Sequence, residues 1–139
     1  IWIRGRIRSD PKQPTVQMLG RWQPFHEGHL ALFKEALKKT GQVCIMVRDT
    51  GGTDDSNPFE YGLVKKKIEE ALLPEYEGKF IVQLVPNITN ISYGRGVGYA
   101  IEEIVLPEEV QKISATKIRA KMKEVAKDVI EATANTPLD

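Results

Sequence analysis

The sequence predicts an α/β fold built on a parallel β-sheet with helices on both faces. Three short apolar runs, at residues 16–19, 42–47 and 80–85, have the length and composition of strands. Two longer segments, at residues 26–39 and 57–74, separate them and carry apolar side chains at helical spacing. Such alternation is typical of parallel strands joined by right-handed crossovers. Ligands bind beyond the carboxyl ends of such strands, so we expect a site near the switch point after the first strand.

The first helix and the strand that follows it have clear boundaries. Leu30, Phe33 and Leu37 recur at i, i+3 and i+7, which makes them the inward face of the helix at residues 26–39. Gly41 is expected to end this helix, because glycine readily adopts the left-handed conformation found there. The run at residues 42–47 is almost continuously apolar, as is typical of a strand covered on both faces.

The second helix is predicted from its capping residues. We expect Asn57 as the N-cap, Pro58 at the first helical position and Glu60 as part of a capping-box-like pattern. Pro74 marks the end of the helix. Its inward face is predicted to consist of Tyr61, Val64, Ile68 and Leu72. The lysines Lys65, Lys66 and Lys67 indicate a solvated face, with a substrate contact by one of them as the alternative.

The two ends of the chain are predicted to lie outside this alternating unit. Residues 1–8 alternate apolar and basic side chains and prolines follow, so residues 1–14 are interpreted as an extended arm or linker before one domain at residues 15–139. Apolar residues on a free arm would be exposed, so we expect them to pair with another subunit or a neighbouring domain. Residues 101–106 are predicted to form a strand. Residues 114–132 are predicted to form a helix with inward side chains Ile118, Met122, Val125 and Val129.

Composition excludes several classes of protein. Twenty basic and nineteen acidic residues give a formal net charge of +1, whereas a nucleic-acid-binding domain usually carries a marked basic excess. The single cysteine, Cys44, fits a reducing compartment. No apolar run reaches membrane-spanning length, so we expect a cytoplasmic protein without a membrane partner. The first residue is Ile1 and not methionine, from which we expect the chain to be a fragment of a longer protein.

The stretch GRWQPFHEGH at residues 20–29 is the strongest candidate for a site. It joins the first strand to the first helix through a turn marked by glycine and proline, and it contains both histidines of the chain, His26 and His29. A helix N-terminus favours anions, and Gly28 leaves room for a phosphate to approach. The alternative is that the histidines merely cap the helix. A zinc site is disfavoured, because two histidines and one cysteine do not supply a usual ligand set, and we expect no protein metal site.

This stretch resembles the HxGH signature of the nucleotidylyltransferase superfamily, which includes nicotinamide-nucleotide adenylyltransferases and small cytidylyltransferases. A second signature of that superfamily, ISxTxxR, is matched by ISATKIR at residues 113–119, about ninety residues later. The resemblance covers residues 15–123 and implies a Rossmann-like fold. It implies that His26, His29 and Arg119 are catalytic. The nucleotide-binding residues that it implies are Gly20, Arg21, Gln23, Phe25, Gly28, Gly94, Arg95, Ile113, Ser114, Thr116 and Lys117.

The resemblance also implies a reaction. A phosphorylated acceptor would attack the α-phosphorus of a nucleoside triphosphate, ATP first and CTP second, and release pyrophosphate. Magnesium would be bound mainly through the triphosphate and water. The partners are then a nucleotide and a small phosphorylated molecule, together with a homo-oligomer or a fused domain such as an adenylylsulfate kinase. The alternative is a catalytically weak nucleotide-binding or regulatory domain of the same fold. The chain departs from relatives by its shortness and by the lack of an acidic residue after Arg95.

Overall fold

The computed structural model describes residues 10–92, 94–95, 100–113 and 116–124, together with the backbone of residues 2–3 and 6–7. Its elements are, in chain order, β1 (Trp2–Ile3), β2 (Arg6–Ile7), β3 (Val16–Gly20), α1 (Glu27–Thr40), β4 (Val43–Arg48), α2 (Tyr61–Leu72), β5 (Phe80–Val85) and α3 (Glu108–Gln111). Residues 116–124 are also helical. No helix in these described ranges has the length and apolar character needed to cross a membrane.

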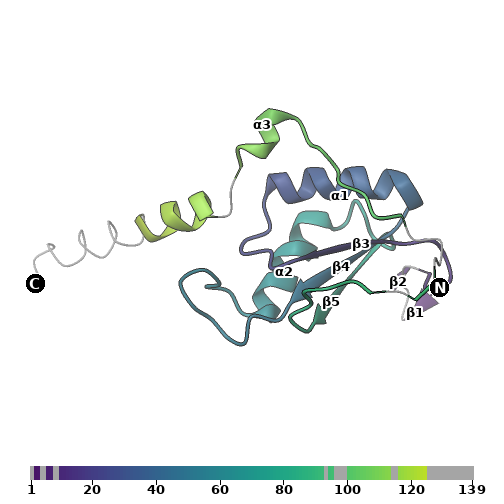
Figure 1. Ribbon diagram of the computed structural model, residues 1–139, viewed down its shortest axis with the longest axis horizontal. Helices are drawn as coiled ribbons and strands as arrows, with labels where there is room; N and C mark the ends of the chain where they lie inside the picture. The colour runs from purple at the N-terminus through teal and green to yellow at the C-terminus, as the bar shows by residue number, and fades with distance from the viewer. Residues whose placement is uncertain are drawn as a thin grey trace, which may run out of the picture.

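A parallel three-stranded sheet in the order β3-β4-β5 forms the centre of the molecule. The register joins Met18, Ile45 and Val82 across the three strands. The predicted α/β class, the parallel sheet and the Rossmann-like type are confirmed. In Figure 1 the carboxyl end of β3 lies on the same side of the molecule as the start of α1, α3 and the helix at residues 116–124. Within the described residues the strands follow chain order, so the expected reversal of strand order after the first strand is not seen.

Both crossover helices pack on one face of the described sheet. Phe33 and Ala36 of α1, and Val64, Ile68 and Leu72 of α2, join the same buried cluster as one side of each strand. The other side keeps Gln17, Ile81 and Gln83 exposed and Cys44 and Met46 half-buried. We expected helices on both faces, and in the part that the structure describes they cover only one. The reason is that strands added in chain order through right-handed crossovers place successive helices on the same side.

Helix α1 has the predicted boundaries and face. Its N-cap is His26, and Gly41 ends it with φ 85°, a left-handed conformation that favours glycine. Phe33 is fully buried and meets the ring of Tyr76 edge-on at 5.1 Å between centroids. Leu30 and Leu37 are partly buried against the same cluster. The apolar spacing therefore predicted the packed face of this helix correctly.

The predicted start of the second helix is wrong. Helix α2 begins at Tyr61, and its N-cap Glu60 makes no side-chain capping hydrogen bond. Asn57 is buried four residues earlier and exchanges backbone hydrogen bonds with Asp54, while its side chain contacts Asp54 and Arg21. The side-chain oxygen of Asn57, which an N-cap would need as its acceptor, is therefore bound to Arg21 instead. The inward face and the end before Pro74 are as predicted.

The segment at residues 100–106 forms no strand, contrary to prediction. Ile101 and Val105 are 71% and 75% exposed, and Glu102 forms an ion pair with Lys39 of α1. In the last helix Met122 is 44% exposed, so its predicted inward position is also wrong, and Val125 and Val129 lie outside the described residues. Apolar spacing indicates which residues share a face, but it does not require that another element covers that face.

The N-terminal strands pair with each other. β1 and β2 are antiparallel, with Trp2 opposite Ile7, and they lie far from α3 in Figure 1. Between them and the sheet, the buried amide of Gln42 holds the chain. Its Oε1 accepts from the backbone N–H of Asp10 at 3.0 Å, and its Nε2 donates to the carbonyl of Asp10 and the hydroxyl of Thr15. The boundary at residue 14 and the expected pairing with another subunit or domain stay predictions.

Candidate functional site

The two sequence signatures meet in space through Arg119. This residue lies in the helix at residues 116–124 and is only 9% exposed. Its Nη1 donates to the backbone carbonyl of Gln23 at 2.5 Å, and its Nη2 donates to Oγ1 of Thr116 at 3.3 Å. Gln23 belongs to the turn that precedes α1. A contact across 96 positions of sequence therefore brings the second signature to the first.

His26 and His29 cap α1 reciprocally. Nδ1 of His26 accepts from the backbone N–H of Gly28 at 3.0 Å and from that of His29 at 3.4 Å. Nδ1 of His29 accepts in turn from the backbone N–H of His26 at 3.2 Å. This is the capping box known for Ser and Glu, made here by two imidazoles. The capping role that the sequence left as an alternative is therefore real.

The cap also determines which nitrogen of each imidazole carries the proton. A ring nitrogen that accepts a hydrogen bond from an N–H has no proton, so each neutral ring must be protonated at Nε2. Within the described residues, neither Nε2 makes a hydrogen bond. Each histidine therefore holds the helix end with one nitrogen and offers an N–H donor with the other. Capping and ligand binding are compatible roles here.

Packing keeps the two imidazoles neutral. Their rings stack at 3.6 Å between centroids, and the Trp22 ring meets His29 edge-on at 4.7 Å. Burial, and secondarily the charge of His26, lowers the pKa of His29 to about 3. Burial also lowers the pKa of His26. Near neutral pH the helix end therefore presents two uncharged donors.

The two glycines of the first signature serve packing. A Cβ on Gly28 would lie 2.8 Å from Cε1 of His26, so a side chain there would displace the imidazole. A Cβ on Gly20 would lie 3.0 Å from the ring of Trp22. Trp22 itself has φ 54°, is buried, and donates from Nε1 to the carbonyl of Met46 in β4 at 3.0 Å. The turn is therefore fixed to the end of the sheet by its tryptophan.

Gln23 and Arg21 tie the turn to the loop before α2. The buried amide of Gln23 donates to the carbonyl of Phe59 and accepts from the N–H of Phe59, both at 2.9 Å. Nη1 of Arg21 donates to Oδ1 of Asn57 at 3.2 Å. The Gln23 side chain thus has a structural use, whereas Arg21 is exposed and has other donors available for a ligand. Phe25 is half-buried beside His29 at 5.5 Å between centroids.

The remaining predicted site residues are only partly brought together. Thr116 contacts Arg119, and Lys117 is exposed in the same helical turn. Ile113 is half-buried next to α3, whose Val110 carbonyl lies 3.7 Å from the Cβ position of Gly28. Gly94 and Arg95 are exposed. Ser114 lies outside the described residues.

One cation at the same edge was missed from the sequence. Arg48 is the last residue of the central strand β4, and its buried Nε has no hydrogen-bond partner. The available signal was an arginine that ends an otherwise apolar strand, at the edge where ligands bind. Among the described residues, no group of three or more His, Cys, Asp or Glu side chains is arranged to hold a metal ion.

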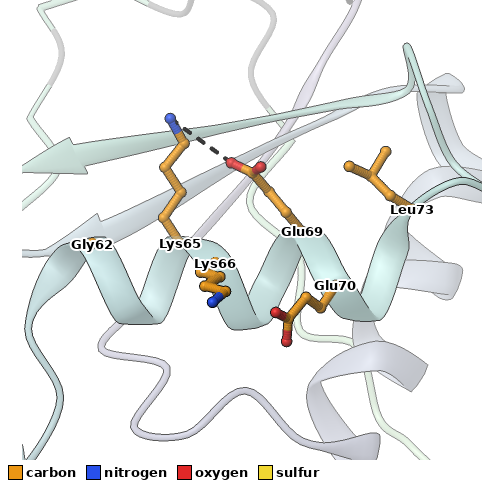
Figure 2. Close-up of a pocket in the computed structure, with 6 residues that line it drawn as sticks. All are labelled: Gly62, Lys65, Lys66, Glu69, Glu70 and Leu73. Carbon is orange, nitrogen blue, oxygen red and sulfur yellow. Dashed lines mark ion pairs between the residues drawn. The ribbon is translucent and has the colours of Figure 1, made fainter.

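Two lysines of the run on α2, Lys65 and Lys66, line an open groove on this helix. Figure 2 shows an open groove along the outer surface of the helix, with Lys65 directed toward Glu69 at 3.8 Å. Its lining residues are Gly62, Lys65, Lys66, Glu69, Glu70 and Leu73. The interpretation of Lys65 and Lys66 as a solvated face is supported by their exposure. Lys67 is half-buried, with Nζ 5.3 Å from the centroid of the Phe59 ring.

Comparison with known proteins identifies this part of the chain. Residues 18–71, which include the histidine turn, β4 and most of α2, match the family described as Cytidylyltransferase-like. This segment is therefore similar to the cytidylyltransferase-like family. A stretch of 64 residues is 31% identical to the nicotinamide-nucleotide adenylyltransferase of Methanococcus aeolicus, covering 42% of this chain and 37% of that protein. The aligned stretch therefore spans little more than a third of this relative. The similarity to the cytidylyltransferase-like family suggests nucleotidyl transfer as the class of activity.

Proposed function

We propose that the chain is a nucleotidylyltransferase that transfers a nucleoside monophosphate from ATP or CTP to a phosphorylated small molecule and releases pyrophosphate. The observation that carries the proposal is the contact of Arg119 with the carbonyl of Gln23, three residues before His26. It joins a buried guanidinium to a helix N-terminus that offers two neutral imidazole donors. Such a combination is suited to a chain of phosphates.

The chemistry requires positioning and charge stabilisation more than proton transfer. The phosphate of an acceptor is already ionised near neutral pH, so it can attack the α-phosphorus without a strong base. The Nε2–H groups of His26 and His29 would donate to oxygens of the α-phosphate and the bridging position as negative charge grows there. Arg119 and Thr116 would hold the leaving pyrophosphate, with Lys117 in the same turn. Both imidazoles carry a proton on Nε2 and act as donors, and the acceptor phosphate is the attacking group, so we expect no covalent nucleotidyl-enzyme.

Magnesium fits this site as a companion of the triphosphate. The described residues offer no carboxylate and imidazole cluster that would form a protein cage. Asp54, near the site, already accepts hydrogen bonds from Asn57 and Ser56, which hold its pKa below the ordinary value. Mg²⁺ characteristically keeps several waters and binds through phosphates. It would supply further neutralisation of the triphosphate charge.

ATP is proposed ahead of CTP. Similarity to an adenylyltransferase supports ATP, whereas the family name supports CTP. The nicotinamide-nucleotide specificity of that relative is proposed here only as one candidate acceptor class. The second turn of the site, at Gly94 and Arg95, is proposed to contact the nucleotide.

The experiment is a pyrophosphate-release assay with Mg-ATP, Mg-CTP, Mg-GTP and Mg-UTP against a panel of phosphorylated acceptors. Thermal melts with each nucleotide run in parallel, because a ligand stabilises the state that binds it. We expect acceptor-dependent pyrophosphate release with ATP, and its loss in His29→Gln. Stabilisation by ATP without any release would favour a nucleotide-binding or regulatory domain. The absence of both would contradict the proposal.

A further inference from the structure

The unpartnered arginine at the end of β4 is the feature that the proposed site leaves unexplained. Arg48 is half-buried, and its Nε is completely shielded from solvent without an acceptor. Among the described residues its guanidinium makes no ion pair and no hydrogen bond. Its neighbours in the chain, Val47 and Asp49, are respectively buried and exposed. The fold therefore places a guanidinium at this position without a counter-ion and without an acceptor for its Nε–H.

Such an arrangement does not stabilise the free protein. A buried N–H without an acceptor loses its hydrogen bonds to water and gains none in return. A half-buried charge without a counter-ion adds a further cost. An apolar side chain of similar length would suit a strand end better. An anion that approaches the guanidinium would satisfy both the charge and the donor.

The position of Arg48 relates it to the proposed phosphate site. It is the last residue of the central strand, opposite Val85 of β5 and one residue beyond the pair Gly20 and Val47. Alternation along β4 puts Val47 on the face covered by α1 and α2, and Arg48 on the opposite face. The histidine cap and Arg119 lie on the side of α1. Donors therefore flank the carboxyl edge of the sheet from both sides.

In-line displacement needs two anion sites. The attacking oxygen and the leaving oxygen lie on opposite sides of the phosphorus that is transferred. If Arg119 holds the pyrophosphate, the acceptor phosphate must approach from the far side. The alternation of β4 puts Arg48 on the sheet face opposite α1 and α2, whereas Arg119 contacts the turn that precedes α1. Arg21, at the same edge, already donates to Asn57.

We propose that Arg48 binds the phosphate monoester of the acceptor. This inference rests on the proposed function for its orientation, since it assigns the second of two anion sites in that reaction. The planar guanidinium matches a phosphate dianion through two parallel hydrogen bonds. Arg48 thus selects acceptors that carry a terminal phosphate. It takes no part in holding the triphosphate.

The test uses inorganic phosphate as the probe for the acceptor and Mg²⁺ with α,β-methylene-ATP as the probe for the nucleotide. Phosphate binding is followed by ³¹P NMR line broadening, with and without the nucleotide analogue. In Arg48→Gln we expect phosphate binding to weaken by at least about tenfold, because a charge-assisted pair is lost, while analogue affinity changes by less than about twofold. Arg48→Lys keeps the charge and should recover part of the phosphate affinity. Lys66→Gln, which removes a charge from the exposed surface of α2, is the matched control and should change neither affinity.

Three outcomes would overturn the assignment. Unchanged phosphate binding in Arg48→Gln would remove the acceptor role. An equal loss of analogue affinity would assign Arg48 to the nucleotide. A lower melting temperature of Arg48→Met without ligands would indicate a structural role, since removal of an unsatisfied cation should leave stability equal or higher. Failure of wild-type protein to bind the analogue would contradict the proposed function alone, because the phosphate titration without nucleotide still tests Arg48.

Discussion

The histidine turn and the Arg119 helix differ in how each is held. In the turn at residues 20–29, the side chains of Arg21, Trp22 and Gln23 donate hydrogen bonds to other parts of the protein. The two histidines cap α1 from within the turn. In the helix at residues 116–124, only Arg119 is buried, and Lys123 reaches the exposed Asp55 at 3.3 Å. In the turn, the same two histidines stabilise the start of α1 and are proposed to bind phosphate. In the helix, the one buried side chain is the proposed catalytic residue Arg119. Substitutions in the two regions should therefore differ in how they change turnover and stability.

The largest expected effect is on turnover. His29→Ala and Arg119→Ala should each lower the rate of pyrophosphate release by roughly 10²–10³, about 3–4 kcal/mol, because each removes a preorganised donor for developing charge. The double variant should lose less than the product of the single effects, since both groups act on one phosphate chain. Single-turnover assays on a confirmed acceptor measure all three. Near-wild-type turnover in His29→Ala would leave helix capping as the only role of that residue.

The unfolding free energies of His29→Ala and Arg119→Ala should also differ between the two regions. His29→Ala also removes an acceptor of the reciprocal cap, so a loss of about 1 kcal/mol in unfolding free energy is expected. Arg119→Ala leaves the Gln23 carbonyl without its buried donor but leaves the cap intact. Urea unfolding of each variant without nucleotide gives both values.

The next largest effect is the pH dependence of stability. The folded protein keeps the pKa of His29 at about 3, against an ordinary value of 6.5. Between these values the unfolded chain binds a proton that the folded protein does not, so the unfolding free energy falls as pH falls through 6.5 and is fully retained above it. The slope from one such group is at most about 1.4 kcal/mol per pH unit. The pKa of His26 is lowered as well and adds to the same slope.

Urea unfolding from about pH 5 to pH 7.5 measures this slope, with His29→Gln as the comparison. The carboxylates, including Asp54, contribute equally to both proteins and cancel in the difference. A flatter profile in His29→Gln is the expected result. Parallel profiles would mean that His29 is not held neutral by the fold, and the two-donor description of the helix end would then be wrong.

Local patterns in the sequence predicted most of the sheet and its first helix. The runs at residues 16–19, 42–47 and 80–85 and the spacing of Leu30, Phe33 and Leu37 are local signals, and they located β3, β4, β5 and α1. The start of α2 was mispredicted because Asn57 is used by Arg21, 36 residues earlier in the chain. The exposure of Ile101 and Met122 depends on which elements pack nearby. Contacts with residues distant in sequence determine where a helix starts and which side chains are buried. The spacing of apolar residues does not contain this information.

In the candidate site too, sequence motifs indicated some residues, whereas others depend on tertiary structure. The two signatures indicated His26, His29 and Arg119, and the contact between Arg119 and Gln23 brings them together. The sequence presented capping and phosphate binding as alternatives, because spacing alone does not show that an imidazole has two separate nitrogens in use. Arg48 was missed because its burial is a property of the assembled sheet edge.

The smallest expected effect is the one that separates the two roles of His26. In His26→Asn, the side-chain oxygen can still accept from the backbone N–H groups of Gly28 and His29, as Nδ1 of the imidazole does. His26→Ala removes that acceptor as well as the Nε2–H donor. We therefore expect His26→Ala to be less stable than His26→Asn by about 1 kcal/mol in urea unfolding. Turnover should be reduced to a similar extent in both, because neither retains Nε2–H. If asparagine restored turnover together with stability, the cap alone would account for His26, and the phosphate donor at this position would have to be sought elsewhere.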